Sequence, residues 1–378
     1  MVALDAMTYA ANPEIIDLFS QNPSFVFCRG DIRDTRLVEE ILDGHRIDTV
    51  VNFAAESHVD RSIADADAFV STNINGVYSL LKTCRKYWSV GRGHFRRFHH
   101  ISTDEVYGSL ENSDPPFTEN SPYRPNSPYS ASKAASDFLT RSFVKTYGFP
   151  ATISNCSNNF GPYQHPEKLI PMTVLKLLDG HAVPVYGDGR QIRDWLHARD
   201  HCRGIDLILH HGKPGETYNI GSRNERTNLE IIGMICDCID GVFASDPGLS
   251  GFFPRCPAAV GRRSRELIEH VADRPGHDRR YGVDNSKMVA ELGFCPTESF
   301  EEQLCRTVGW YVARAQERLS VVQPESKQQD VRQSEREQPE TESSESELLE
   351  IEQSERKPPE KVLSERNLPV SGQPEDRL

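Results

Sequence analysis

The pair Tyr129 and Lys133 is the feature of this sequence that most directly suggests chemistry. Residues four apart in a helix lie one turn from each other on the same face. A lysine ammonium beside a phenol favours the phenolate and lowers the tyrosine pKa. We therefore expect Tyr129 to act as a base that removes a proton from a substrate hydroxyl near neutral pH.

A second group of reactive side chains, Thr103, Asp104 and Glu105, lies upstream. One carboxyl group can act as an acid and the other as a base if their surroundings separate their pKa values. On spacing alone, a solvated pair of loop carboxylates and a packed surface tyrosine are equally good interpretations. The surrounding sequence has to decide between them.

The elements that position these residues are predicted by the hydrophobic pattern. Short apolar runs alternate with helical patterns, which predicts an α/β fold with a Rossmann-like, doubly wound parallel sheet. The helix that carries Tyr129 has a clear start, because Ser127 suits the N-cap and Pro128 the first helical position. The expected strands are 2–4, 24–28, 48–53, 98–102 and 151–154, with helices at 35–42 and 69–86.

Composition divides the chain into three segments. Residues 1–157 are expected to form a Rossmann-like dinucleotide-binding domain, and residues 158–319 mainly a smaller substrate lobe interleaved with the last sheet strands. Within that lobe, residues 243–261 are rich in Gly, Pro and Phe and read as a loop insertion. Residues 320–378 hold 15 acidic and 8 basic residues, so this segment carries a net charge of −7 out of the −13 of the whole chain. Such a segment cannot bury enough apolar surface to order itself, so we expect a disordered tail, with a partner-binding tail as the alternative.

The bulk properties exclude several classes of protein. A net charge of −13 argues against nucleic acid as a partner. No apolar run reaches the length of a membrane span, and the start of the chain does not resemble a signal peptide. The nine cysteines are scattered, which predicts reduced thiols and a cytoplasmic protein. No metal site is predicted, because the histidines lack metal-like partners and read as structural: His58, His99, His100, His210 and His211.

One expected element of a dinucleotide site is missing. Such a site opens with a strand and a Gly-rich turn, followed about 20 residues later by an acidic residue for the ribose. Asp5 ends a strand and looks like that acidic residue, but only four residues precede it. We therefore expect the chain to begin at the second strand of its sheet, through truncation, a misassigned start or loss of the element. Cofactor binding and stability are then expected to be weak.

A series of motifs links this sequence to a known family. They include Ala54-Ala55-Glu56-Ser57-His58-Val59-Asp60-Arg61-Ser62, Ser102-Thr103-Asp104-Glu105-Val106-Tyr107-Gly108, Tyr129-Ser130-Ala131-Ser132-Lys133, Asn155-Cys156-Ser157-Asn158-Asn159-Phe160-Gly161-Pro162-Tyr163 and Asp273-Arg274-Pro275-Gly276-His277-Asp278. Over residues 1–315 the chain resembles the extended short-chain dehydrogenase/reductases, the NAD-dependent epimerase/dehydratase family. Within them it is most similar to the dTDP-glucose 4,6-dehydratases of deoxysugar biosynthesis. Epimerases and decarboxylases of the same fold usually lack the Asp-Glu pair.

The resemblance implies a redox cycle that closes on itself. NAD takes a hydride from C4 of the sugar, water leaves from C5 and C6, and the hydride returns to C6, which makes the enzyme a hydro-lyase. By this resemblance Tyr129 is the base for the C4 hydroxyl, Lys133 tunes it and holds the nicotinamide ribose, and Thr103 binds the reacting oxygen. Glu105 removes the C5 proton, and protonated Asp104 supplies the departing C6 hydroxyl with its proton.

The resemblance also implies the binding residues. The cofactor set is Asp5, Thr8, Asp31, Ile32, Phe53, Ala54, Ala55, Thr72, Ser102, Tyr129, Lys133 and Asn159. The set for the nucleotide sugar dTDP-glucose is Ser57, Thr103, Asn158, Glu167, Lys168, Leu169, Pro184, Tyr186, Arg193, Asn219, Arg274 and His277. The alternatives are turn residues at strand ends for Asp5 and Asp31, surface salt bridges for the arginines and a turn cap for His277.

Three functions stay open at this stage. They are the dehydratase, another sugar-nucleotide epimerase or decarboxylase of the superfamily, and a non-catalytic remnant without a pyrophosphate loop. The Asp-Glu pair disfavours the second, and the missing Gly-rich turn is the support for the third. The resemblance further implies a homodimer through the helices at 69–86 and 129–147.

Overall fold

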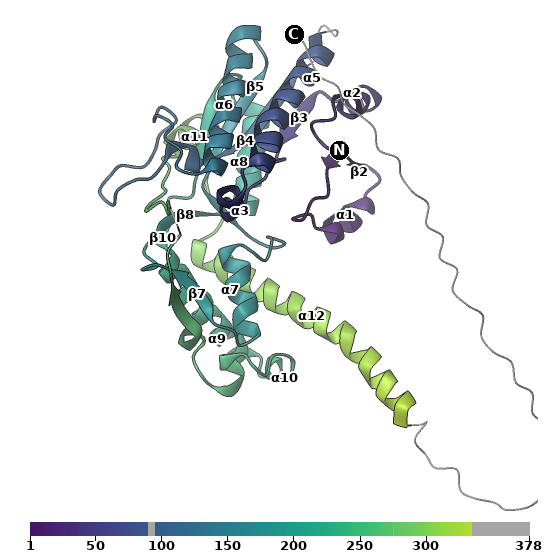
Figure 1. Cartoon of the computed structure of the whole chain (residues 1–378), viewed down its shortest axis with the longest axis vertical. Helices are drawn as coiled ribbons and strands as arrows, with labels where there is room; N and C mark the ends of the chain where they lie inside the picture. Colours follow the sequence, from purple (N-terminus) through teal and green to yellow (C-terminus); the bar gives the residue numbers. More distant parts are fainter. Residues whose placement is uncertain (90–94, 275, 335–378) are drawn as a thin grey trace, which may run out of the picture. The chain divides into compact units, whose positions relative to one another are not determined.

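The computed structural model describes residues 1–89, 95–274 and 276–334 (Figure 1). The chain divides into one compact unit, Met1–Pro324, and a second segment, Glu325–Leu378. Of that segment only residues 325–334 are described. The remainder of the tail expected from the sequence lies outside the described residues.

The helices and strands alternate along the first unit, as the sequence pattern predicts. The strands are β1 Val2–Asp5, β2 Val26–Arg29, β3 Thr49–Asn52, β4 Arg97–Thr103, β5 Ala151–Cys156, β6 Asn158–Phe160, β7 Val183–Tyr186, β8 Ile192–His197, β9 Thr217–Ile220, β10 Glu225–Thr227 and β11 Ile268–Val271. The α-helices are α1 Pro13–Ser20, α2 Thr35–Gly44, α3 Val59–Ala64, α4 Asp67–Phe69, α5 Val77–Ser89, α6 Pro128–Tyr147, α7 Leu169–Leu178, α8 Ala198–His211, α9 Asn228–Ser245, α10 Leu249–Phe252, α11 Ser286–Leu292 and α12 Phe300–Ser334. A π-helical turn, η1 Val70–Gly76, and three 3₁₀ turns, η2 Asp104–Tyr107, η3 Pro257–Val260 and η4 Ser264–Leu267, complete the set.

The central sheet is parallel and has the order β3-β4-β5-β9. All three of its strand pairs are parallel, as expected for strands joined by helical crossovers. The first two strands pair with each other in a separate parallel sheet, with Val2 opposite Val26. The expected α/β fold with parallel sheets is confirmed, but β1 and β2 do not join the central sheet. The described strands form four sheets, and the remaining two are β10-β8-β6 and β11-β7.

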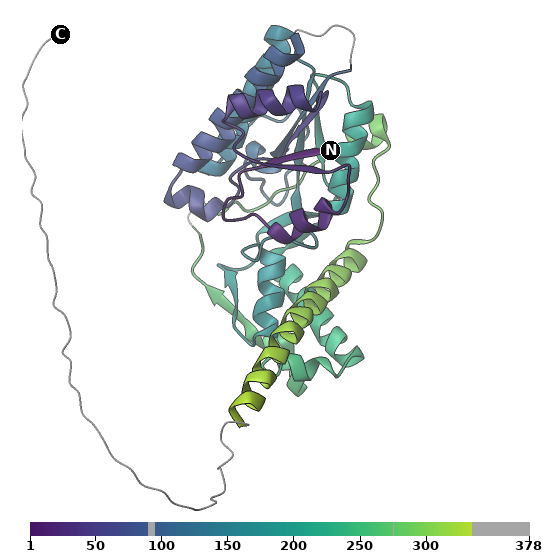
Figure 2. The same ribbon diagram turned by 90° about the vertical axis from the view of Figure 1, so that its right-hand side faces the viewer.

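Helices cover both faces of the central sheet (Figures 1 and 2). On one face α2, α5 and α6 pack on the sheet, and Leu81 and Phe98 are fully buried there. On the other face α8 and α11 pack around Ile208 and Ile220. In β4, Phe98 faces the first cluster and Ile101 the second, because side chains alternate along a strand. The carboxyl ends of the strands are thereby held rigidly at one edge.

A second cluster of elements has its own apolar core. It joins α7, α9, α12 and strand β7, and its centre includes Leu177, Val183, Ile235 and Leu304. The sequence prediction of a loop insertion at 243–261 is wrong in part, because α9 runs to Ser245 and α10 and η3 lie within that range. Helix α12 also continues to Ser334, so residues 320–334 are helical and not the unstructured segment expected.

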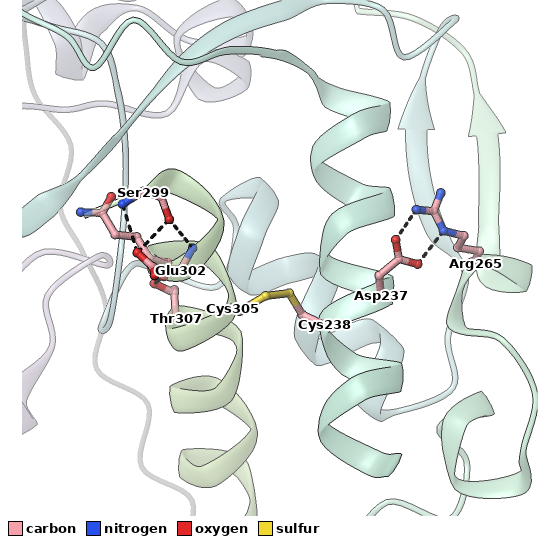
Figure 3. The surroundings of a disulfide bond; sticks show 8 residues. Asp237, Cys238, Arg265, Ser299, Glu302, Cys305 and Thr307 are labelled. Carbon is pink, nitrogen blue, oxygen red and sulfur yellow. Dashed lines mark hydrogen bonds and ion pairs between the residues drawn. A yellow bond between two sulfur atoms is a disulfide. The ribbon is translucent and has the colours of Figure 1, made fainter. Parts of the chain in front are cut away.

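A disulfide links α9 to α12 in this second cluster. Cys238 and Cys305 form the bond, 67 residues apart in sequence (Figure 3). The expectation that all nine cysteines are reduced is therefore wrong for these two, because the packing of the helices brings together sulfurs that the sequence spacing does not relate. Cys236 and Cys238, the closest pair in sequence, are not bonded to each other.

No helix in the described part of the chain combines the length and the apolar character that a membrane crossing requires.

Candidate active site

The acidic pair is presented by the end of strand β4. Thr103 is the last residue of β4 and caps the 3₁₀ turn η2, where its Oγ1 accepts a hydrogen bond from the Glu105 backbone N–H at 3.3 Å. The turn ends at Gly108, whose φ of +94° and close approach to the Arg124 carbonyl exclude a Cβ. Local sequence therefore fixes the turn that holds both carboxyl groups.

The two carboxyl groups have pKa values raised above their usual range. Asp104 is 2% exposed, and burial raises its pKa well above 3.8, with Glu105 adding to the effect. Burial also raises the pKa of Glu105 to about 7, while the Arg193 guanidinium opposes that shift. The raised pKa of Asp104 favours its protonated form, and Glu105 can accept a proton near neutral pH. These are the two roles that the sequence left conditional.

Tyr129 and Lys133 lie in the first turns of α6, as predicted. The helix starts at a capping box in which Ser127 Oγ accepts from the Ser130 backbone N–H, and Pro128 takes the first position. The Tyr129 ring is in edge contact with Phe69, with ring centroids 6.4 Å apart. The local sequence thus determines which turn of α6 faces the end of β4.

The electrostatics of this pair differ from the sequence expectation. Burial raises the pKa of Tyr129 well above 10, with Glu105 adding to the effect, where a lowered pKa was expected. Burial of the Tyr129 hydroxyl is the first cause, and Lys133, which is 4% exposed, donates its Nζ to the Ile101 carbonyl at 2.6 Å. Burial also lowers the pKa of Lys133. In the protein alone, desolvation outweighs the lysine.

Two residues near these groups were missed by the sequence analysis, Cys156 beside Lys133 and Tyr281 beside Arg193. Cys156 donates its thiol to the Ser102 carbonyl at 3.3 Å, and burial raises its pKa to about 12. Tyr281 is buried, lies 4.2 Å beneath the Arg193 guanidinium and donates its hydroxyl to Asp278. Tyr281 stands four residues after His277, so only its neighbourhood to a predicted binding residue could have suggested it.

A third missed residue, Asn73, holds a loop of the site in place. It lies in the π-helical turn η1, a type of turn that is frequent at functional sites. Its side chain accepts from the Glu56 backbone N–H at 2.9 Å and donates to the Glu56 carbonyl and to Ser132 Oγ. The loop after β3 is thereby tied to the same helix that carries Tyr129.

The predicted cofactor residues lie mainly at the carboxyl ends of parallel strands. Asp5 ends β1 and accepts from the Met7 backbone N–H at 2.7 Å, so its turn role is realised. Asp31 follows β2 and pairs with Arg33, its Oδ2 lying 2.6 Å from Nη2. Thr8 lies in the loop after β1, and Ala54 and Ala55 follow β3.

The other members of this set take different places. Ile32 is 7% exposed and fills the core, where a Cβ on Gly76 would meet its Cδ1 at 2.6 Å. Phe53 is exposed, and Thr72 lies in η1. The Ser102 hydroxyl donates to Asp137 at 2.9 Å and is therefore already used.

The predicted substrate residues form two groups. In the first, Lys168 Nζ donates to the Ser57 carbonyl at 3.3 Å and lies 3.8 Å from Glu167. Glu167 lies 3.4 Å from His58, which also caps α3. These contacts join the loop after β3 to the start of α7, where Leu169 is the first residue.

The second group surrounds Arg193 on β8. Arg193 is 8% exposed and acts electrostatically on Glu105. The guanidinium carbon of Arg274 lies 4.3 Å from the centroid of the Tyr186 ring. Arg274 Nη2 also lies 3.0 Å from Asp60 Oδ2, so the salt bridge named as the alternative is present. His277 Nδ1 lies 2.7 Å from Asp273, and Pro184 lies on β7 beside Tyr186.

Asn219 is not available to a ligand. It is fully buried, its Oδ1 accepts from Tyr107 OH at 2.8 Å, and its Nδ2 donates to the Phe117 carbonyl at 3.0 Å. Its amide is thus used inside the protein, because the chain brings two loops against β9. The assignment of the Asn219 side chain to nucleotide binding is therefore not supported.

Several buried polar atoms beside the site have no partner within the described protein. They are Asp104 Oδ2, Asn155 Oδ1, Asn158 Oδ1, Asn159 Oδ1 and Arg274 Nε. Buried polar groups are nearly always hydrogen-bonded in folded proteins, so these atoms suit a polar ligand that supplies the missing bonds. Among the described residues, no group of three or more His, Cys, Asp or Glu side chains is arranged to hold a metal ion.

Comparison with known proteins agrees with this site. The sequence profile of the family described as GDP-mannose 4,6 dehydratase matches residues 1–307. A dTDP-glucose 4,6-dehydratase of Salmonella typhimurium is 47% identical over 328 residues, which cover 84% of this chain and 86% of that protein.

Solved structures of dTDP-glucose 4,6-dehydratases are also similar to this chain. The dTDP-glucose 4,6-dehydratase DesIV of Streptomyces venezuelae, with NAD and TYD bound, is 44% identical with a TM-score of 0.72 and covers 82% of this chain and 86% of its own. The dTDP-glucose 4,6-dehydratase of Bacillus anthracis in complex with NAD is 40% identical with a TM-score of 0.69, over 82% and 87% of the two chains.

Proposed function

The chain belongs to the family described as GDP-mannose 4,6 dehydratase, and we propose that it dehydrates dTDP-glucose to dTDP-4-keto-6-deoxyglucose with NAD as cofactor. The observation that carries this proposal is the pair of buried Asp104 and half-buried Glu105 near Tyr129 and Lys133, in a chain 47% identical to a dTDP-glucose 4,6-dehydratase. An epimerase or decarboxylase of this fold needs no acid and base for C5 and C6. The paired carboxyl groups therefore favour elimination of water.

The protein's own residues are proposed to move the protons of the reaction. Tyr129 accepts the proton of the C4 hydroxyl, and Thr103 hydrogen-bonds the same oxygen. Because burial holds the pKa of Tyr129 well above 10 in the protein alone, this role requires the positive charges of Lys133 and of bound NAD to lower that pKa. Oxidation to a C4 ketone makes the C5 proton acidic, and Glu105 then removes it. Its pKa of about 7 suits a base near neutral pH. Asp104, whose pKa is raised well above 3.8, supplies its proton to the C6 hydroxyl so that water departs.

NAD, when bound, supplies the acceptor for the C4 hydride and the donor of the hydride that returns to C6. The residues proposed to hold it are Tyr129 and Lys133 for the nicotinamide ribose, Asp5 and Asp31 for the adenosine, and Asn159, whose buried Oδ1 has no partner in the described protein. Asp5 and Asp31 lie at the carboxyl ends of β1 and β2, and dinucleotides bind at this edge in open α/β sheets. No residue is assigned to the pyrophosphate.

The substrate is proposed to lie between the two groups of polar residues described above. Arg193 and Arg274 suit the diphosphate because a guanidinium donates two parallel hydrogen bonds to phosphate. The Tyr186 ring offers a flat surface for the base. Ser57, Glu167 and Lys168 remain for the sugar, together with Asn158, whose buried Oδ1 has no partner among the described residues.

The test is turnover of dTDP-glucose by the purified chain with NAD⁺, followed by the alkaline absorbance of the 4-keto-6-deoxy product. Glu105→Gln should abolish elimination while C4 oxidation stays detectable as a rise in nicotinamide absorbance. Glu266→Gln, an exposed surface change, should leave the rate unaltered and serves as the matched control. A normal rate of product formation by Glu105→Gln would refute the assigned base. Absence of product from the unchanged chain would leave the non-catalytic alternative.

We also propose that two copies pair through η1, α5 and α6. Four large apolar side chains on these elements are exposed: Val70 47%, Tyr78 46%, Phe138 55% and Tyr147 50%. A second copy can bury such a surface in a two-fold dimer. Light scattering should give a dimer for the native chain and a monomer for Phe138→Lys. Leu18→Lys, at an equally exposed apolar position outside this surface, should stay dimeric. The cytoplasmic location stays a prediction.

A further inference from the structure

The carboxyl group of Asp137 contacts the end of β4 next to Thr103 and takes no part in the proposed proton transfers. It stands on α6, one helical turn after Lys133, and is fully buried. Its Oδ2 accepts from Tyr123 OH at 2.8 Å, Ser102 Oγ at 2.9 Å and Asn155 Nδ2 at 3.4 Å. A carboxylate is expensive to bury, so three donors at one oxygen indicate a defined task.

These donors come from three parts of the chain that meet at the site. Ser102 immediately precedes Thr103 in β4, and Asn155 lies on β5, where its Nδ2 also donates to the Thr103 carbonyl at 3.1 Å. Tyr123 belongs to the loop before α6 and receives a hydrogen bond from Arg141 at 2.7 Å. Asp137 therefore ties α6 to the ends of the two central strands.

The second oxygen of Asp137 has no hydrogen-bond donor. Oδ1 has no partner among the described residues, and His100 Nε2 lies 3.5 Å away. Burial, together with the positive charge of Lys133, lowers the pKa of His100 far below 6.5, so His100 is neutral and cannot balance a carboxylate. If Asp137 is ionised, a positive charge other than His100 has to balance its carboxylate.

Lys133 is a buried ammonium group that likewise lacks a close partner of opposite charge. It is 4% exposed, and no ion pair within 4.0 Å involves it in the part of the chain that the structure describes. Burial lowers its pKa, and the groups that oppose this shift are Asp137 and, more weakly, the Cys156 thiol. Burial raises the pKa of Asp137, and Lys133 is the first group to oppose that shift. The two side chains stand four residues apart on α6 and reach adjacent residues of β4, since Lys133 Nζ donates to the Ile101 carbonyl at 2.6 Å and Asp137 Oδ2 accepts from Ser102 Oγ at 2.9 Å. Each side chain thus supports the charged form of the other.

We propose that Asp137 is a positioning residue of the active site, and that its carboxylate is the counter-charge that keeps the buried Lys133 ammonium beside Tyr129. The proposal rests on the proposed function, because it assigns Lys133 the task of supporting Tyr129. The groups that face this pair are Arg141 on α6, His100 on β4, Cys156 on β5, Tyr107 on η2 and Tyr123 in the preceding loop. Arg141 reaches the carboxylate through Tyr123 and does not replace the lysine.

The first test compares pH profiles. In Asp137→Asn, which keeps the shape and an acceptor oxygen, we expect kcat at neutral pH to fall about tenfold and KM for dTDP-glucose to stay within about twofold. The alkaline limb of kcat should move down by at least about one pH unit, because Lys133 loses its proton more easily. A uniform loss of rate without that movement would mean a merely structural role and would overturn the proposal.

A matched control is available in the same chain. Asp200 is also fully buried and accepts from Thr297 and Gln303, far along the sequence from α6. Asp200→Asn should lower stability while leaving the alkaline limb in place. If both variants moved the limb equally, the effect would come from a lost buried carboxylate in general, and the proposal would fail.

The second test needs no activity and uses thermal unfolding. Lys133→Met leaves Asp137 without its counter-charge, so the pKa of Asp137 rises further in the folded protein. A carboxyl group with a raised folded pKa loses its stabilising contribution as pH increases, so the Tm of Lys133→Met should fall more steeply between pH 5 and 8 than that of the native chain. Adding Asp137→Asn should restore several degrees at pH 8. Additive losses in the double variant would refute the pairing.

These tests separate the inference from the function on which it rests. If the native chain does not turn over dTDP-glucose, the proposed function fails, and the double-variant cycle still decides whether Lys133 and Asp137 are coupled. If the native chain is active and the cycle is additive, the function stands and the inference is wrong. If Asp137→Asn alone does not fold but the double variant does, the coupling is supported.

Discussion

The disulfide between Cys238 and Cys305 allows a quantitative prediction about stability. The bond joins α9 to α12 and closes a loop of 67 residues (Figure 3). The chain-entropy relation for a loop of this length predicts that the bond destabilises the unfolded state by about 4 kcal/mol at 25 °C. Reduction should remove this contribution, because the sulfurs stay close in the folded protein but separate in the unfolded chain.

The change can be expressed as a shift in Tm. The first unit spans residues 1–324. At an unfolding entropy of about 2.1 cal/mol/K per residue, its total is about 0.7 kcal/mol/K. A loss of about 4 kcal/mol therefore corresponds to a decrease in Tm of about 6 °C.

The assay is calorimetry of the native chain before and after treatment with a dithiol, with free thiols counted in denaturant. Seven free cysteines are present with the bond formed and nine after its reduction. Cys238→Ser combined with Cys305→Ser should have the lower Tm under both conditions, whereas Cys202→Ser, an exposed free thiol, should respond as the native chain does. Two additional thiols without a fall in Tm would refute the reasoning, and no additional thiols would show that the bond is absent.

Three further predictions concern the site and the core. Asp104→Asn should lower kcat by about 100-fold or more, because the departing hydroxyl loses its acid; steady-state kinetics would detect this, and an unchanged kcat would contradict it. The rate should fall as pH drops below about 7, where Glu105 becomes protonated. Arg193→Gln should move this acidic limb of the pH–rate profile to higher pH, because Arg193 opposes the rise in the pKa of Glu105. An acidic limb that does not move would exclude this coupling. Leu177→Ala, at a fully buried position, should cost about 2–5 kcal/mol in chemical denaturation, whereas the exposed Leu18→Ala should cost little; equal effects would show that the second core is loosely packed.

Much of the fold could be read from the sequence because the relevant signals are local. The expected strands at 98–102 and 151–154 correspond to β4 Arg97–Thr103 and β5 Ala151–Cys156. The start of the Tyr129 helix was predicted because Ser127 and Pro128 act within one turn of it. The expected helix at 69–86 is realised as α4, η1 and α5, and the π-helical turn within it had no recognisable signal.

The composition of the candidate site was also predictable, but the state of its side chains was not. The sequence places Asp104 and Glu105 side by side, and only burial decides that both pKa values rise. Tyr281 and Asn73 were missed because their contacts join distant segments. Asn219 was assigned to a ligand because nothing in its sequence neighbourhood reveals that Tyr107 and Phe117 use its amide.

The sequence by itself therefore determined the spacing of Tyr129 and Lys133, the caps of their helix and the strands at 98–102 and 151–154, since each depends on residues a few positions apart. Tertiary structure alone decided the Cys238–Cys305 bond, the contact of Lys133 with the Ile101 carbonyl and the placement of Asp137 beneath the strand ends. The physical reason is that desolvation and long-range pairing depend on which side chains surround a group in space. That information does not exist along the chain until the helices and sheets have packed.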